Sequence, residues 1–162
     1  MRLAGSNFVG VTEKLKINYM EVLNHIVLVD DNETTSFLNN RLLGRLALAN
    51  KVSTFSRAEE ACRFLWKDLA ATPEPAADLV FVDLKMPGMS GFEFLEQYSQ
   101  LPAPVQERTV VAVLTTSMHA ADTARVAQYP NVEYLTKPLT EEKLQRLLAK
   151  RFDGSPAPAP AK

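Results

Sequence analysis

Four short apolar segments, far apart along the chain, each end at a charged or hydroxyl-bearing side chain. The segments lie at residues 25–30, 78–83, 110–116 and 132–136, and the side chains at their ends are Asp30, Asp31, Asp83, Thr115, Thr116 and Lys137. If the segments are parallel strands, their carboxyl ends gather at one edge of the sheet, where open α/β sheets place their ligands. The pattern therefore predicts one crevice that holds three carboxylates, a hydroxyl and an ammonium.

The segments between these strands have helical spacing. Apolar residues three or four positions apart predict a helix with one apolar face, formed by Phe37, Leu38, Leu42, Leu43 and Leu46. Ser56 and Glu59 have the spacing of a capping box and predict the start of a second helix. Further helices are expected around Phe92, Leu95 and Tyr98, at 120–128 and after Thr140, and a fifth strand at 51–55. Strands that alternate with helices predict an α/β fold, a doubly wound parallel sheet covered on both faces.

The two ends of the chain differ in composition from its middle. Residues 1–22 show no helical or strand period and are interpreted as a flexible leader. Residues 153–162 alternate Pro with Ala, which is typical of an extended, disordered tail. The folded domain is predicted at 23–152. Within it, the Pro-containing segments at 71–77 and 101–104 are predicted to be connecting loops.

Charge and apolar patterning argue against several classes of partner. The chain has 18 Lys+Arg and 19 Asp+Glu, a net charge of -1, and no block of like charges, so nucleic acid and anionic membranes are not favoured. No apolar segment approaches the roughly 18 residues of a membrane-spanning helix. The single cysteine, Cys62, falls within a helical pattern and is expected to be a buried structural thiol. These features predict a soluble, cytoplasmic protein.

The three carboxylates repel one another unless a cation lies among them. Mg²⁺ is the expected cofactor because it prefers oxygen ligands, commonly one or two carboxylates, and binds phosphoryl oxygens at the same time. The Asp30-Asp31 pair by itself is equally consistent with a cap on the first helix. Capping and metal binding can coexist on adjacent residues.

Asp83 is the expected nucleophile of this crevice. A lone aspartate after a strand is more often a turn or cap residue. The expected proximity of Asp30, Asp31 and Lys137 instead favours a reactive role for Asp83. A carboxylate beside Mg²⁺ can attack a phosphoryl group and form an acyl phosphate, and Lys137 would neutralise charge on that group. Lys137 precedes Pro138, which ends the last strand.

Two further residues leave alternatives open. Thr115 has a hydroxyl that can donate to a phosphoryl oxygen, and Thr116 competes for this role because a shift of one residue reverses the face of a strand. Tyr134 lies on the last predicted strand. It is either a half-buried aromatic that supports the sheet or part of a signalling switch, and both roles can apply in turn.

Four motifs, in this order, closely resemble the receiver domain of bacterial two-component response regulators over about residues 24–150. They are Val27-Leu28-Val29-Asp30-Asp31-Asn32, the run from Asp83-Leu84-Lys85-Met86-Pro87-Gly88 to Leu95, Leu114-Thr115-Thr116-Ser117, and Lys137-Pro138. The resemblance implies a flavodoxin-like (βα)5 fold with strand order 2-1-3-4-5. No pattern of an output domain follows residue 152, so the chain is similar to stand-alone, single-domain receivers.

The resemblance also implies a role for each site residue. Asp83 would accept the phosphoryl group, and Mg²⁺ would be held by Asp30, Asp31, Asp83 and the backbone carbonyl of Lys85. Thr115 would be the switch hydroxyl and Lys137 the cation that pairs with phosphate. Tyr134 would be the aromatic residue that changes rotamer as the switch is thrown.

The partners implied by the resemblance are other signalling proteins. The phosphoryl group would come from a sensor histidine kinase or a histidine phosphotransfer protein. Phosphorylation would alter the surface formed by the helix at 120–128, the strand at 132–136 and the helix after Thr140. That surface would dock an unknown downstream protein or form a homodimer, or the phosphoryl group would be relayed onward.

Two other functions use a similar set of residues. A phosphatase of the haloacid-dehalogenase type also has an Asp nucleophile, Mg²⁺ and Lys, but it needs an aspartate two positions after the nucleophile, where this chain has Lys85. A pseudo-receiver keeps the fold as a binding module without phosphorylation, and such proteins generally lose part of the acidic cluster. The complete cluster favours a phosphorylated signalling protein rather than an enzyme.

Overall fold

The computed structural model describes residues 22–66 and 77–152. The predicted leader up to residue 21, the predicted tail at 153–162 and nearly all of the predicted loop at 71–77 lie outside the described residues. Within the described ranges, no helix is both long enough and apolar enough to cross a membrane.

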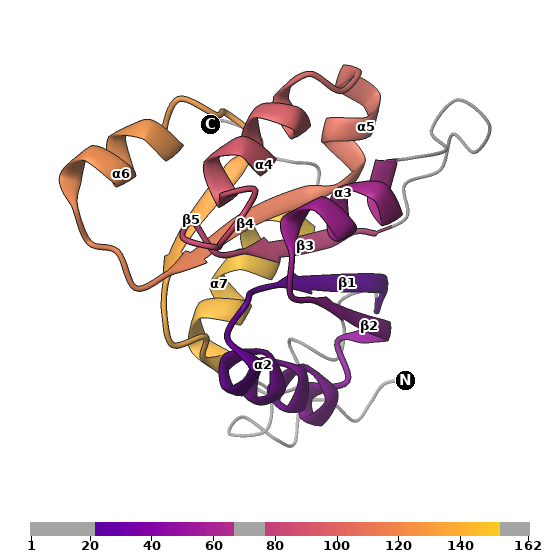
Figure 1. The fold of residues 1–162 in the computed structure, drawn as a ribbon. Helices are drawn as coiled ribbons and strands as arrows, with labels where there is room; N and C mark the ends of the chain where they lie inside the picture. Colours follow the sequence, from indigo (N-terminus) through magenta and orange to yellow (C-terminus); the bar gives the residue numbers. More distant parts are fainter. Residues whose placement is uncertain (1–21, 67–76, 153–162) are drawn as a thin grey trace.

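All five predicted strands are present and form one parallel sheet (Figure 1). They are β1 (Leu23–Val29), β2 (Ala49–Phe55), β3 (Leu79–Val82), β4 (Val110–Thr115) and β5 (Val132–Thr136). Their order is β2-β1-β3-β4-β5, and each neighbouring pair is parallel. The predicted fold class and strand order are therefore confirmed.

Helices cover both faces of this sheet (Figure 1). On one face the buried core includes residues from α3 (Ala58–Trp66), α4 (Gly91–Ser99) and α6 (Ala120–Val126). On the other face it includes residues from α2 (Glu33–Leu46) and α7 (Glu141–Phe152). The strands β1, β3 and β4 are buried on both faces, which is why they read as continuous apolar segments in the sequence.

The predicted apolar face of α2 is wrong in its first half. Leu43 and Leu46 are buried against the sheet, but Phe37 and Leu38 are 63% and 54% exposed. The inward stripe of the helix runs through Asn39, Leu43 and Leu46. Phe37 lies two positions from Asn39, a rotation of roughly 200° around the helix axis, so it cannot face the sheet with that stripe. Two large apolar side chains are left at the surface.

Two local predictions also need correction. The predicted loop at 101–104 runs into a short helix, α5 (Ala103–Arg108), that starts directly after Pro102. Proline is accepted there because the first-turn N–H groups of a helix have no intrahelical partner. The second helix begins at Ala58, beyond Ser56, and the capping box found in the described ranges instead joins Ser90 to Glu93 at the start of α4.

Other local predictions are confirmed. The Thr140 Oγ1 accepts a hydrogen bond from the Lys143 backbone N–H at 3.2 Å and thereby caps α7. Tyr98 and Cys62 are both buried. Burial raises the pKa of the Cys62 thiol to about 12, so the sulfur is protonated at neutral pH and behaves as a packing group.

Candidate functional site

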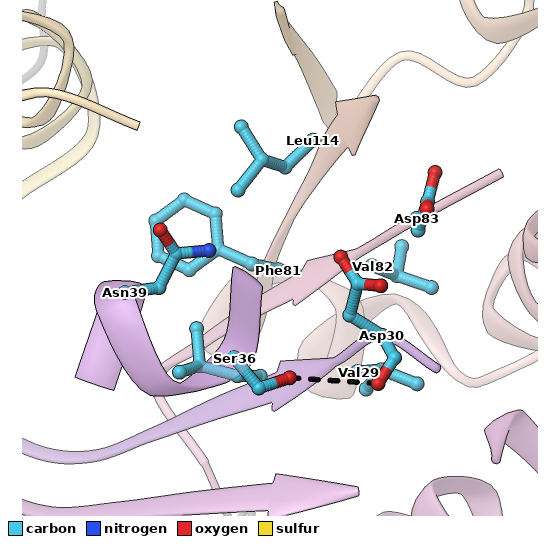
Figure 2. A pocket seen from close by; sticks show the side chains of 9 residues that line it. Val29, Asp30, Ser36, Asn39, Phe81, Val82, Asp83 and Leu114 are labelled. Carbon is cyan, nitrogen blue, oxygen red and sulfur yellow. Dashed lines mark hydrogen bonds between the residues drawn. The ribbon is translucent and has the colours of Figure 1, made fainter. Parts of the chain in front are cut away.

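The carboxyl edge of the sheet brings together the acidic residues that end β1 and β3. Carboxylate oxygens of Asp30, Asp31 and Asp83 all lie within 4.8 Å of one another. Figure 2 shows the Asp30 side chain extending from the end of β1 toward Asp83, with Ser36 and Asn39 of α2 beside it. Asp30 is 6% exposed, whereas Asp31 is open to solvent. Hard oxygen donors this close fit a divalent ion such as Mg²⁺.

Lys137 reaches the same cluster from the end of β5. Its Nζ lies 2.7 Å from Asp30 Oδ2 and 3.1 Å from Asp83 Oδ2. The Lys137-Pro138 peptide is cis, and the Lys137 backbone N–H donates to the Thr115 carbonyl at 2.8 Å. The structure thus places the ammonium between two carboxylates that are far apart in the sequence.

Burial governs the ionisation of the inner pair. Burial raises the pKa of Asp30 above its usual value, although hydrogen bonds from Lys137 and the Asn32 backbone N–H oppose the shift. For Lys137, burial favours the neutral amine, but the hydrogen bonds to Asp30 and Asp83 outweigh it and raise the pKa. Lys137 is therefore positively charged at neutral pH, and Asp30 binds a proton more readily than an ordinary aspartate does.

This raised pKa gives the site a pH dependence with a definite sign. Mg²⁺ and a proton compete for Asp30, so Mg²⁺ affinity should be constant well above the raised pKa of Asp30 and fall as the pH drops through it. The limiting slope for one proton is about tenfold per pH unit. Calorimetric Mg²⁺ titrations at a series of decreasing pH values measure this slope.

The matched control is Asp30→Asn, which should bind Mg²⁺ more weakly and show no such slope. An affinity of the unaltered protein that stays constant down to about pH 4 would contradict the assignment, because an ordinary aspartate titrates only near there.

The loop that follows Asp83 is held from α3. Glu59 Oε2 accepts a hydrogen bond from the Met89 backbone N–H at 3.2 Å. Gly88 adopts a φ of 74°, and a Cβ at this residue would lie 2.6 Å from Glu59 Oε2. A glycine is needed there because the backbone is left-handed and because the carboxylate approaches it closely. The Lys85 carbonyl, the expected backbone ligand, belongs to this loop.

The two candidate threonines have different surroundings. Thr115 is 1% exposed, and its Oγ1 accepts from the Ser117 N–H at 3.1 Å. Thr116 is exposed and lines a surface groove that also contains Lys137. Tyr134 is half-buried on β5, and its hydroxyl donates to the Ser117 carbonyl. The buried threonine and the tyrosine therefore both contact the segment between β4 and α6.

Several residues of the site were not found from the sequence. The residue that caps α2 is Asn32, whose side chain accepts a hydrogen bond from the Thr35 N–H at 2.9 Å. Neither Asp30 nor Asp31 caps this helix. Asp30 instead accepts from the Asn32 N–H. An Asn immediately before a helical pattern is itself a cap signal and could have been used. The contact of Glu59 with the Asp83 loop has no comparable local signal, since it joins residues 30 positions apart.

A family model of the response regulator receiver domain matches residues 26–149. The chain belongs to this family. It is 28% identical over 130 residues to the signal transduction histidine-protein kinase BarA of Escherichia coli K12, a region that is 80% of this chain and 13% of BarA. The chain thus spans a small part of that relative.

Solved receiver structures are similar over nearly their whole length. A two-component response regulator from Cytophaga hutchinsonii has a TM-score of 0.71 at 24% identity, covering 80% of this chain and 97% of that one. A receiver protein from Dyadobacter fermentans has a TM-score of 0.65 at 30% identity, covering 76% and 94%. Phosphorylation and Mg²⁺ binding are general to receiver domains, which are typically signal transducers and not enzymes. The acidic cluster of this chain fits both an aspartyl phosphate and Mg²⁺.

Proposed function

We propose that this receiver domain accepts a phosphoryl group on Asp83 from a histidine kinase or a histidine phosphotransfer protein. The observation that carries the proposal is the contact of Lys137 Nζ with Asp83 Oδ2 beside a cluster of three carboxylates. Asp30, Asp31, Asp83 and the Lys85 carbonyl would hold Mg²⁺. When bound, the ion supplies positive charge that neutralises phosphoryl oxygens.

The transfer itself is a substitution at phosphorus. A carboxylate oxygen of Asp83 attacks the phosphorus of a phosphohistidine, a P–O bond forms, and the P–N bond breaks. The electron pair of the P–N bond stays on the leaving imidazole, which takes up a proton from solvent. Lys137 Nζ already contacts Asp83 Oδ2 and would pair with the oxygens of the new phosphoryl group.

The same residues supply a route from the phosphoryl group to the surface. Thr115, or Thr116 in its place, would move to donate a hydrogen bond to the phosphoryl group. Movement of the β4–α6 segment would release the Tyr134 hydroxyl from the Ser117 carbonyl, its present acceptor. The surface of α6, β5 and α7 would then change shape. A coupling of about 1 to 3 kcal/mol between the two sites changes partner affinity roughly five- to 150-fold.

The proposal also includes the partners that would bind the surface of α6, β5 and α7. They are a downstream protein, a second copy of the chain as a homodimer, or the next protein of a relay. The present charge distribution, a net of -1, gives no support to a nucleic-acid partner.

A phosphodonor protein has to cover the surface around Asp83, because transfer requires direct contact between the two reacting atoms. Phe37 and Leu38 of α2 are exposed apolar side chains near this site, because Phe37 lines a surface pocket with Asp30 and Leu38 lines one with Lys137. Leu38 lines a groove of about 500 Å³ together with Thr116, Lys137 and Pro138. We propose that an apolar helix face of the donor docks on this part of α2.

Leu38→Asp is expected to slow transfer from a protein donor by about ten- to 100-fold, because a charge in an apolar contact must be desolvated. Phosphorylation by acetyl phosphate, which needs no docking, should be unchanged. Arg45→Asp, an exposed change near the far end of α2, is the matched control and should leave both rates unaltered. Equal loss of both rates in Leu38→Asp would argue against a docking role.

The function itself is tested by incubating the protein with a phosphohistidine donor, with Mg²⁺ and with excess EDTA. We expect hydroxylamine-sensitive labelling that depends on Mg²⁺. A folded protein that neither binds Mg²⁺ nor responds to beryllofluoride would instead be a pseudo-receiver. Rapid multiple-turnover hydrolysis of phosphate esters would indicate a phosphatase.

A further inference from the structure

A lysine in the first turn of α7 is bound to the turn that carries Lys137. Lys143 Nζ donates to the Thr136 carbonyl at 2.6 Å and to the Pro138 carbonyl at 2.9 Å. It also lies 3.3 Å from Thr136 Oγ1. Thr136 and Pro138 are the residues on either side of Lys137. One ammonium therefore joins the main chain before and after the residue that contacts Asp30 and Asp83.

The position of Lys143 is unfavourable for the helix alone. The amino end of a helix carries partial positive charge, so acidic residues are preferred there and Glu141 and Glu142 meet that preference. A cation in the same turn opposes it. Carbonyl oxygens of the β5–α7 turn offset this repulsion, because they supply the negative partial charge that the helix end lacks. Lys143 is thus better explained by its contacts with the turn than by α7.

The contacts complete the fixation of the Lys137 backbone. On one side the Lys137 N–H donates to the Thr115 carbonyl of β4 at 2.8 Å. On the other, Lys143 holds the carbonyls of both neighbours. The main chain around Lys137 is therefore bound to both β4 and α7. From this fixed position the Lys137 Nζ contacts Asp30 and Asp83.

We propose that Lys143 is a positioning residue that acts through Lys137. It fixes the turn so that the Lys137 ammonium stays between Asp30 and Asp83, where it can meet an incoming phosphoryl group. The part of this inference that concerns the phosphoryl group rests on the proposed function. The effect on Mg²⁺ binding follows from the contacts of the unphosphorylated protein.

Two measurements change in opposite directions when Lys137 is lost. Lys137 and Mg²⁺ compete for the same carboxylates, so removing the ammonium should tighten Mg²⁺ binding. The same removal should slow phosphorylation, because a positive charge on the phosphoryl group is lost. A general loss of structure would weaken both. Displacement of Lys137 through Lys143 should therefore produce the same pair of opposite changes, with smaller size.

The experiment compares Lys143→Met, Lys137→Met and the double variant by Mg²⁺ titration and by the rate of phosphorylation with acetyl phosphate at saturating Mg²⁺. For Lys143→Met we expect phosphorylation to slow about tenfold, in line with the sensitivity of transfer to small misplacements. Its Mg²⁺ dissociation constant should fall about two- to threefold, because a displaced ammonium competes less. The double variant should equal Lys137→Met in both measurements, because Lys143 has nothing to position once Lys137 is gone.

Arg146→Met is the matched control. Arg146 lies one turn further along α7, is exposed, and pairs with Glu142 at the surface, so both measurements should equal those of the unaltered protein. Lys143→Gln keeps a donor for one carbonyl and should lie between the unaltered protein and Lys143→Met. It also serves if the methionine variant does not fold.

Unchanged Mg²⁺ affinity and phosphorylation rate in both Lys143 variants would overturn the inference, and so would additive effects in the double variant. Failure of the proposed function has a different signature. In that case the unaltered protein is not phosphorylated, yet the Mg²⁺ titrations still report whether Lys143 acts through Lys137.

Discussion

Asp83→Asn is expected to abolish phosphoryl incorporation, with a loss of at least about 100-fold in initial rate. The amide has the shape of the carboxylate but lacks the anionic oxygen that attacks phosphorus. The fold should be retained, since Lys137 keeps its 2.7 Å contact with Asp30 and the repulsion among three carboxylates is relieved. Intact-mass measurement after incubation with acetyl phosphate and Mg²⁺ detects the added phosphoryl group.

Asp78→Asn is the matched control for loss of a carboxylate. Asp78 lies just before β3, at the opposite edge of the sheet, and its Oδ2 accepts from the Asn24 backbone N–H at 2.6 Å. The substitution should lower stability by about 1 to 3 kcal/mol and leave phosphorylation unaltered. Full labelling of Asp83→Asn would place the acceptor on another residue and refute the proposed function.

The convergence of the site could be predicted because it depends on strand polarity. Strands buried on both faces read as apolar segments, and once they are parallel their carboxyl ends share an edge. The positions of Asp30, Asp83 and Lys137 follow from this rule. The choice between Thr115 and Thr116 does not, because adjacent strand residues face opposite ways. In the structure Thr115 is paired with Thr136 of β5 and is buried, whereas Thr116 is exposed. This difference is visible only once the strands are placed.

Contacts that do not follow from strand polarity could not be predicted. The hydrophobic period of α2 includes Phe37, but which stripe faces inward is decided by the sheet that Leu43 and Leu46 meet. Lys143 lies in a helical pattern that accounts for its neighbours, and its acceptors are carbonyls, which no sequence pattern displays. Local propensity thus predicts the elements and their polarity, while the residues that hold the site depend on tertiary packing.

Gly91→Ala is expected to be among the most destabilising single-methyl additions near the site. A Cβ on Gly91 would lie 2.3 Å from the Asp83 carbonyl oxygen and 2.6 Å from the Leu84 Cα. Both atoms belong to the backbone, so neither can rotate away, and the start of α4 has to separate from the segment that carries Asp83. The Gly91 N–H also donates to the Leu84 carbonyl at 2.9 Å, a bond that such a separation would lengthen.

We expect Gly91→Ala to lower the free energy of unfolding by about 3 kcal/mol, the upper range for overpacking, and the melting temperature by about 10 °C. Displacement of Asp83 from Lys137 should also slow phosphorylation.

Gly44→Ala is the matched control, because a Cβ there has no atom within 4 Å. Gly44 lies in the last turn of α2, where alanine still favours the helix, so the substitution should raise stability by about 0.5 kcal/mol. Circular dichroism melts decide between the two outcomes. Equal melting temperatures for Gly91→Ala and the unaltered protein would mean that α4 can move without disturbing Asp83, and that the acceptor is positioned by Glu59 and Lys137 instead.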